Sequence, residues 1–247
     1  MSQSCIIVTG ASRGIGAAIA ESLARAGFMV GCLSRSGDLP HRQNASDEVR
    51  SRWLGAACDV TDASQVRAAI ADIQARCNLP LAGLVNNAGV HMEGKSETLP
   101  LDEFDKVMQT NANSVLIGSQ SVYPYLRESG GLIVNIGSFF DKMGVKRNLA
   151  YCASKAAVGA ITRCLAVEWA PAGVRVMNIA PGYIVTDLNR EAMSTGPLRA
   201  YLEKRIPGGE PGTADDVAGL VTLLFSMPGQ FLSGETIYID GAQSIAH

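Results

Sequence analysis

The chain has 247 residues, of which 47% are hydrophobic and 18% are charged, so it carries enough apolar material for one sizeable core and too little charge for a disordered protein. Its 21 basic and 23 acidic residues give a formal charge of -2, which argues against a nucleic-acid-binding surface or a polybasic membrane patch. The first apolar run is too short for a signal peptide or a membrane span.

The cysteines and histidines indicate neither disulfides nor a metal site. None of the six cysteines forms a Cys-x-x-Cys pair, so we expect reduced, mostly buried thiols in a cytoplasmic protein. His41, His91 and His247 lack metal-ligand spacing, and we predict no catalytic metal.

Short apolar runs alternate with longer amphipathic segments along the chain. The expected strands are Cys5–Val8, Met29–Leu33, Leu54–Cys58, Gly83–Val85, Leu132–Ile136, Val174–Ile179 and Thr236–Ile239. The expected helical or amphipathic segments are Ile15–Ala26, Ser64–Arg76 (capped by Thr61 or Asp62), Phe104–Leu126, Tyr151–Trp169 and Thr213–Met227. This alternation predicts an α/β fold with a doubly wound parallel sheet, in a single domain over residues 1–247. The long connection around 183–212 is expected to form a substrate lid.

A glycine-rich turn follows the first expected strand, in the run Thr9-Gly-Ala-Ser-Arg-Gly-Ile-Gly16. Glycines permit a tight turn and let backbone amides approach a pyrophosphate at the start of a helix. Its place between a strand and a helix strengthens this interpretation. The predicted cofactor-binding residues of this turn are Gly10, Ser12, Arg13, Gly14, Ile15 and Gly16.

The end of the second expected strand indicates which dinucleotide binds. An acidic side chain there holds a ribose hydroxyl of NAD, whereas arginine accommodates the additional phosphate of NADP. Ser34 and Arg35 occupy this position, and Arg13 lies in the turn that should face it. Because two guanidinium groups match one phosphate, we predict NADP(H). Asp38, after Gly37, is the rival group and favours NAD.

Three further residues suggest proton-transfer chemistry. Ser138 follows the fifth expected strand, at the edge where open α/β sheets bind ligands. Tyr151 and Lys155 lie four positions apart, on one face of a helix. An ammonium about 4 Å from the phenol is worth up to about 4 kcal/mol at an effective dielectric constant of about 20, and so lowers the pKa of Tyr151. Tyr151 can then exchange a proton with an alcohol or carbonyl oxygen, to which Ser138 hydrogen-bonds.

Together these motifs resemble those of the short-chain dehydrogenase/reductase family over nearly the whole chain. The matching segments are Thr9-Gly-x-x-x-Gly-x-Gly16, Asp59, Asn86-Asn87-Ala88-Gly89, Asn111, Ser138, Tyr151-x-x-x-Lys155 and Pro181-Gly182. The resemblance implies a Rossmann fold with seven strands in the order 3-2-1-4-5-6-7. It also implies a homotetramer that pairs the apolar faces of 104–126 and 151–169.

The resemblance also implies roles for individual residues. The implied catalytic set is Asn111, Ser138, Tyr151 and Lys155, with Asn111 supporting a water chain from Lys155. The implied cofactor-lining residues are Asp59, Val60, Asn87, Ala88, Gly89, Tyr151, Lys155, Pro181, Gly182, Ile184 and Thr186. Simpler structural roles remain open: Asn111 can kink its helix, Asn87 can satisfy backbone groups, and Asp59 can cap a helix.

The predicted function is NADP(H)-dependent reduction of a ketone or 3-oxoacyl thioester, since the sequence most resembles 3-oxoacyl thioester reductases. An NAD-linked alcohol dehydrogenase is the alternative, and a non-catalytic dinucleotide sensor is a remote one. Docking of an acyl-carrier protein is doubtful because only Arg127 is basic in the corresponding stretches. The basic group Lys142, Lys146 and Arg147 either belongs to a solvated loop or attracts an anionic small-molecule substrate such as a carboxylate or a CoA thioester. Met193, Leu198, Tyr201 and Leu202 of the lid suit an apolar substrate or a subunit contact.

Overall fold

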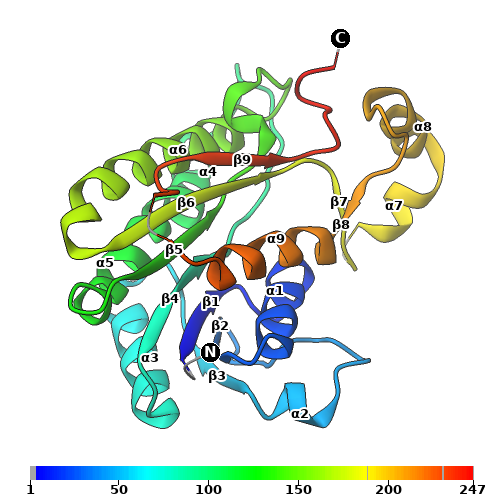
Figure 1. The fold of residues 1–247 in the computed structure, drawn as a ribbon. Helices are drawn as coiled ribbons and strands as arrows, with labels where there is room; N and C mark the ends of the chain where they lie inside the picture. Colours follow the sequence, from blue (N-terminus) through cyan, green and yellow to red (C-terminus); the bar gives the residue numbers. More distant parts are fainter. Residues whose placement is uncertain (1–3, 188, 230, 247) are drawn as a thin grey trace.

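A parallel sheet forms the centre of the computed structural model, which describes residues 4–187, 189–229 and 231–246 (Figure 1). Leu188 in the predicted lid, His247, and the ends of the predicted range 1–247 lie outside the described residues. The sheet strands are β1 (Cys5–Thr9), β2 (Met29–Ser34), β3 (Trp53–Ala57), β4 (Leu81–Asn86), β5 (Gly131–Ile136), β6 (Val174–Pro181) and β9 (Thr236–Ile239). Within the described residues their order is β3-β2-β1-β4-β5-β6-β9, all parallel. The predicted α/β fold and strand order are confirmed, β9 being the seventh strand of this sheet.

Helices cover both faces of the sheet. The helices of the described residues are α1 (Gly14–Arg25), α2 (Asp47–Arg50), α3 (Ala63–Cys77), α4 (Leu101–Met108), α5 (Ser114–Leu126), α6 (Leu149–Trp169), α7 (Arg190–Ser194), α8 (Gly196–Arg205) and α9 (Ala214–Ser226), of which α7 and α8 form a separate cluster. One buried apolar cluster joins the sheet to α1 and α9, and a second joins it to α3, α5 and α6. No helix among the described ranges has both the length and the apolar character needed to cross a membrane.

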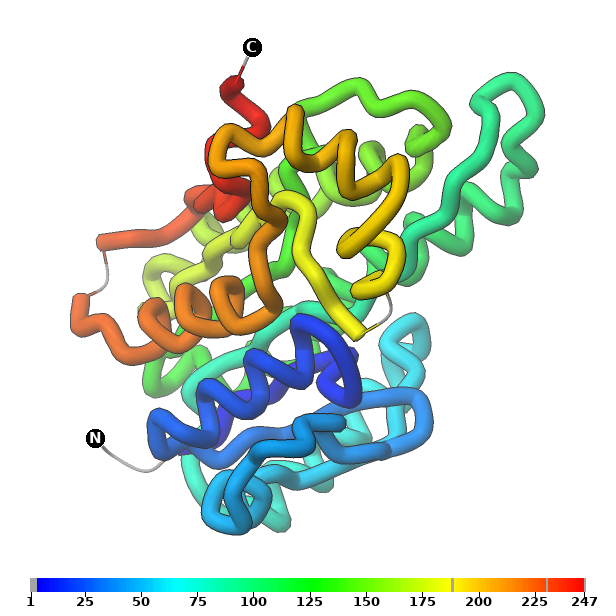
Figure 2. Tube along the Cα trace, turned by 90° about the vertical axis from the view of Figure 1, so that its right-hand side faces the viewer, coloured from blue at the N-terminus to red at the C-terminus, as the bar shows by residue number. Residues whose placement is uncertain are grey.

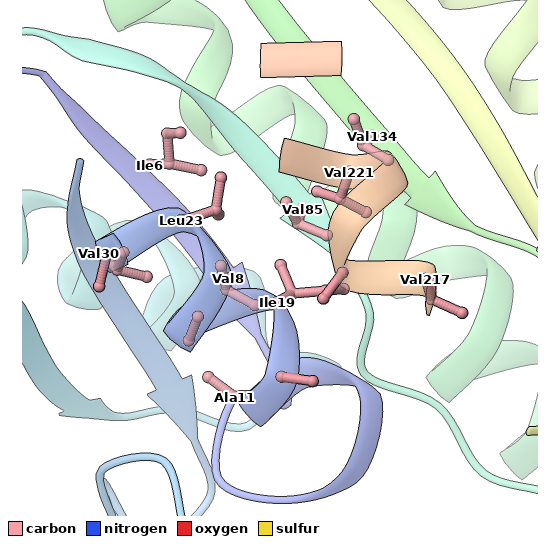
Figure 3. Close-up of a cluster of buried hydrophobic side chains, with 14 of the residues drawn as sticks. Ile6, Val8, Ala11, Ile19, Leu23, Val30, Val85, Val134, Val217 and Val221 are labelled. Atoms are coloured by element: carbon pink, nitrogen blue, oxygen red, sulfur yellow. The ribbon is translucent and has the colours of Figure 1, made fainter. Parts of the chain in front are cut away.

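The sequence of β1 is apolar without interruption because both faces of the strand are buried. Successive side chains point to opposite faces, so Ile6 and Val8 enter one cluster while Cys5 and Ile7 enter the other. Figure 3 shows Ile6 and Val8 near Leu23 and Ile19 of α1. Full burial of one such aliphatic side chain contributes about 1.5–3 kcal/mol.

The expected boundaries agree with the observed ones to within three residues, and short elements that the sequence did not predict lie between them. Residues 104–126 fall in α4, a π-helical turn (Gln109–Asn113) and α5. A short 3-10 helix (Phe139–Lys142) follows Ser138. Asp62, not Thr61, caps α3, while Thr213 caps α9 as the sequence suggests.

The predicted lid has structure of its own. It contains β7 (Ile184–Val185), α7, α8 and β8 (Gly212–Thr213), and β7 and β8 pair as a separate small sheet. Figure 1 shows α7 and α8 beyond the carboxyl end of β6. Figure 2 shows the segment that follows β7 beside the start of α1. Thr186 lies there, because a Cβ placed on Gly14 falls 3.5 Å from its Cγ2.

The cysteine prediction holds only in part. Cys5, Cys32 and Cys58 are buried, whereas Cys77 and Cys152 are half-buried and Cys164 is exposed. Cys152 lies in the first turn of α6, on a side that solvent reaches, so it does not follow the expected burial.

Candidate active site

The glycine turn between β1 and α1 is too crowded for side chains. Gly10 and Gly14 have φ values of 64° and 55°, which L-residues rarely adopt. A Cβ on Gly16 falls 2.2 Å from the Gly10 carbonyl oxygen, and one on Gly10 falls 3.0 Å from Ala88 Cα. The turn therefore leaves its backbone open to a ligand, as dinucleotide binding requires.

The first turn of α1 leaves its amide groups available. Its N-cap, Arg13, makes no side-chain capping hydrogen bond, and the turn carries no acidic residue. Uncapped amides and the helix dipole favour an anion at this end. The residues present therefore fit the diphosphate of a dinucleotide.

Thr9 connects the glycine turn to the loop after β4. Its buried hydroxyl accepts hydrogen bonds from the backbone amides of Asn87, at 3.0 Å, and Ala88, at 3.1 Å. The Asn87 side chain returns to the turn, donating to the carbonyls of Thr9, at 2.9 Å, and Gly10, at 3.2 Å. Asn87 thus satisfies backbone groups, as the simpler interpretation proposed, and also lines the cleft described below.

This connection gives a prediction for stability. Thr9→Val keeps the shape of the side chain but leaves two amides without their acceptor, so we expect a loss of about 2 kcal/mol in the free energy of unfolding. Urea denaturation measures it. Thr9→Ser is the control, because it keeps the hydroxyl and loses only one methyl group, at a cost of about 1 kcal/mol. Equal stability of the two variants would contradict the assignment.

Two adjoining clefts, of about 560 and 530 Å³, gather the predicted residues at the carboxyl edge of the sheet. The first is lined by Gly10, Ser12, Arg13, Gly14, Ile15, Gly16, Ser34, Arg35, Asp59, Val60, Asn87, Ala88, Gly89 and Thr186. Predicted residues lining the second are Ile15, Asn87, Gly89, Ser138, Tyr151, Lys155, Pro181, Gly182, Ile184 and Thr186. Ile15, Asn87, Gly89 and Thr186 recur in both sets, so the clefts meet. Asn111 alone of the predicted set lines neither.

The end of β2 presents arginine, not aspartate, to the first cleft. Arg13 and Arg35 both line it, whereas Asp38 does not and accepts a hydrogen bond from Ser36. Hydrogen bonds from Thr61 hold the pKa of Asp59 below its usual value, and the nearby Arg35 charge acts in the same direction. Asp59 therefore shapes the turn before α3 and lines the cleft as well.

Tyr151 lies in the second cleft between two other rings. The centroid of His91 is 4.8 Å away and that of Phe140 is 5.9 Å away, both edge-to-face. Burial raises the pKa of the phenol, and a hydrogen bond with Ser138 acts in the opposite direction. The Ser138 hydroxyl also accepts from the Phe140 amide at 3.2 Å.

Lys155 is buried, and no carboxylate of the described part of the chain forms an ion pair with it. Its Nζ donates to the carbonyl oxygen of Ile136 at 2.8 Å and lies 5.6 Å from the centroid of the Tyr151 ring. Burial lowers the pKa of Lys155 to about 8. The expectation that Lys155 lowers the pKa of Tyr151 is not met here, because desolvation of the phenol outweighs any attraction by the ammonium group.

Asn111 joins three elements behind the clefts. Its side chain accepts from the amide of Val90 at 2.8 Å, and donates to the carbonyl of Val90 at 2.8 Å and to Ser154 at 3.1 Å. A π-helical turn carries Asn111 toward this loop, so more than a local kink is involved. A Cβ on Gly89 would lie 3.2 Å from Asn111 Oδ1 and 3.8 Å from Lys155 Nζ, which shows how closely these groups meet.

Several lining residues escaped the sequence analysis. They are His91, Glu93, Phe139, Phe140, Val145, Asn148, Tyr183 and Asn189. For two of them the sequence offered a signal, because Phe139 directly follows Ser138 and Tyr183 directly follows Gly182. Of the predicted lid residues, Met193 and Leu198 line the cleft, whereas Tyr201 is exposed and Leu202 is buried within the lid.

The basic group predicted to attract an anion stays outside the cleft. Lys142, Lys146 and Arg147 are exposed and do not line it, and the Lys142 ammonium lies 3.6 Å from the ring centroid of Tyr238. A cation over an aromatic ring is stabilised there. The predicted attraction to the site is therefore not supported by the positions of these residues.

Comparisons with known proteins agree with this arrangement. The enoyl-(acyl carrier protein) reductase family matches residues 10–242. An NAD-dependent glycerol dehydrogenase of Listeria innocua is 33% identical over 97% of this chain and 93% of its own length. A 3-oxoacyl-[acyl-carrier-protein] reductase of Salmonella typhimurium is 34% identical over 95% of each chain. A gluconate 5-dehydrogenase from Burkholderia cenocepacia, solved with NADP and tartrate, superposes with a TM-score of 0.88 at 30% identity, over 100% of this chain and 97% of its own.

The match extends over the sheet, both clefts and the lid, at identities that establish common descent. The chain belongs to the short-chain dehydrogenase/reductase family, oxidoreductases that act on alcohols and ketones with a nicotinamide dinucleotide.

Proposed function

We propose that this protein is an NADP(H)-dependent reductase that converts a ketone to the secondary alcohol. The observation that carries the proposal is the meeting of the Tyr151 phenol, the Ser138 hydroxyl and the Lys155 ammonium in the second cleft, which adjoins the first. One cleft fits the dinucleotide and the other has room for a small carbonyl compound.

In this proposal Tyr151 is the proton donor. The reduced nicotinamide, when bound, supplies a hydride to the carbonyl carbon. Tyr151 transfers its phenolic proton to the carbonyl oxygen, so that one hydride and one proton convert the ketone to an alcohol. Ser138 hydrogen-bonds the same oxygen, and Lys155 stabilises the phenolate that remains. Burial raises the pKa of the phenol, so Tyr151 holds at neutral pH the proton that it donates.

The positions of the charged side chains around the first cleft support the preference for NADP(H). Arg13 and Arg35 face the first cleft, and the rival Asp38 is outside its lining. We expect Arg35→Ala to lower kcat/KM for NADPH by about 10- to 100-fold, since a charge-assisted hydrogen bond contributes about 1.5–3 kcal/mol. The value for NADH should stay nearly unchanged. Steady-state kinetics with both dinucleotides measures the difference.

Arg67→Ala is the matched control, because Arg67 is exposed on α3 and lines neither cleft. It should leave the NADPH/NADH ratio unchanged. A native enzyme with equal or better kcat/KM for NADH would overturn the assignment of the arginines.

The NAD-linked alcohol dehydrogenase remains the second candidate. The relative from Listeria innocua, named an NAD-dependent glycerol dehydrogenase, favours it. We prefer the NADP(H)-dependent reductase, because Arg13 and Arg35 line the first cleft and Asp38 does not.

We also propose the homotetramer. Large apolar side chains remain exposed on α5 and α6, including Leu116, Tyr125, Leu149 and Val167, the last 77% exposed. Such faces are ordinarily covered by symmetric association. The cytoplasmic location stays a prediction.

The function is tested by following NADPH and NADH oxidation across simple ketones, a sugar ketone, a steroid and acetoacetyl-CoA, with the reverse reaction on the corresponding alcohols. We expect NADPH-dependent reduction of at least one ketone. Absence of turnover in both directions with both dinucleotides would remove the proposed function.

A further inference from the structure

An aromatic wall lines the second cleft next to Tyr151. We use this name for Phe139, Phe140 and Tyr183, all of which line the cleft. The centroid of Phe140 is 5.9 Å from that of Tyr151 and 6.3 Å from that of Tyr183, and that of Phe139 is 5.5 Å from Tyr183. These pairs meet edge-to-face or nearly so. A further flat ring can continue such a series, because aromatic edges and faces carry opposite partial charge.

The two side-chain amides of the cleft, those of Asn148 and Asn189, are already occupied within the protein. The Asn148 amide donates to the Lys146 carbonyl at 3.0 Å, and its oxygen bonds the His91 ring. The Asn189 side chain donates to the Ile184 carbonyl at 3.0 Å and accepts from the Thr186 amide at 2.7 Å. A substrate with many hydroxyl groups would lose water here and gain few partners in return.

The charge of the cleft disfavours anions. Among the described residues that line it, Glu93 and Lys155 are the charged ones. Lys155 is buried and bonded to Ile136, whereas Glu93 is exposed at the rim. Burial raises the pKa of Tyr183 to about 12, the neighbouring Tyr201 and Glu93 act in the same direction, and Arg205 acts against them. A carboxylate or phosphate on the substrate therefore meets the negative charge of Glu93, and among the described residues that line the cleft the buried Lys155 is the cation.

We propose that the preferred substrate is an uncharged ketone whose carbonyl bears an aromatic ring. This inference rests on the proposed reductase function and names its substrate class. The ring packs against the aromatic wall while the carbonyl reaches Tyr151 and Ser138. Polyols, acidic sugars and phosphorylated or CoA-linked substrates are disfavoured by the same lining.

The first test compares matched ketones with NADPH. Acetophenone and cyclohexyl methyl ketone have similar size, and only the first has an aromatic ring. We expect kcat/KM for acetophenone to be about three- to tenfold higher, the range of one aromatic pair. The anionic para-acetylbenzoate should be about tenfold or more poorer than acetophenone, because its charge is desolvated beside Glu93. Dihydroxyacetone, representing polyol substrates, should be poorer still.

Substitutions in the cleft test which side chains cause these substrate preferences. Tyr183→Leu should bring the acetophenone/cyclohexyl ratio close to one, whereas Tyr183→Phe keeps the ring and should keep the ratio. Glu93→Gln should narrow the gap between acetophenone and para-acetylbenzoate by about threefold, as expected for one exposed charge. Each result is a ratio within one variant, so a change in overall stability does not imitate it.

A binding measurement separates this inference from the proposed function. Benzamide carries an aryl group on a carbonyl that the enzyme does not reduce, and cyclohexanecarboxamide is its non-aromatic match. Calorimetric titration into the NADP+-saturated protein should show about three- to tenfold tighter binding of benzamide. Selective benzamide binding without ketone turnover would remove the reductase and leave the aromatic site. Equal binding of the two amides, or a preference for cyclohexyl methyl ketone or dihydroxyacetone, would overturn the substrate class and leave the reductase.

Discussion

Tyr151→Phe is expected to lower kcat by about 100- to 10,000-fold, the contribution of a positioned general acid. The substitution removes one oxygen and keeps the ring, which packs edge-to-face against His91 and Phe140. The cleft for the dinucleotide is lined mainly by other elements, so NADPH should bind with nearly native affinity. Ketone reduction measures the loss in kcat, and fluorescence titration with NADPH measures the retained affinity.

Tyr123→Phe is the matched control. Tyr123 lies on α5, stacks on Trp169 with centroids 4.4 Å apart, and lines neither cleft. The same loss of a hydroxyl there should leave kcat unchanged. Activity of Tyr151→Phe within about tenfold of the native enzyme would remove Tyr151 from the chemistry.

The parallel sheet and its order were predictable because alternating apolar runs and amphipathic segments leave few topologies. The four-residue spacing of Tyr151 and Lys155 likewise places both on one face of any helix, and both lie in α6. The glycine turn was readable because no other residue tolerates both the positive φ of Gly10 and the close contacts of Gly16. These features are local in the sequence, which is why they could be derived from it.

The electrostatics of the site could not be derived in the same way. Spacing shows that Lys155 faces Tyr151, but the pKa values of both groups depend on burial by segments distant in the chain. The aromatic wall was missed for a similar reason. Phe139, Phe140 and Tyr183 look like ordinary core residues until β5 and β6 bring the segments that follow them together.

Lys155→Met is expected to abolish most of the activity and at the same time to stabilise the protein without dinucleotide. A buried ammonium with no carboxylate costs free energy, and the difference between the ordinary pKa of 10.5 and about 8 corresponds to about 3 kcal/mol. Methionine has a similar shape and no charge, so we expect a gain of about 1–3 kcal/mol at pH 7, less the hydrogen bond to Ile136. Urea denaturation at fixed protein concentration measures this gain.

The stability difference between Lys155→Met and the native protein should also depend on pH. Between pH 8 and 10.5 the unfolded chain holds the Lys155 proton and the folded chain does not, so raising the pH through this interval favours the folded state. The stability gap between Lys155→Met and the native protein should therefore be full below pH 8 and shrink toward pH 10.5. Lys95→Met, at an exposed lysine 3.9 Å from Glu97, is the control and should change stability by less than about 0.5 kcal/mol. A less stable Lys155→Met at pH 7 would show that the ammonium group holds the fold together, and a gap independent of pH would show that its pKa is not lowered.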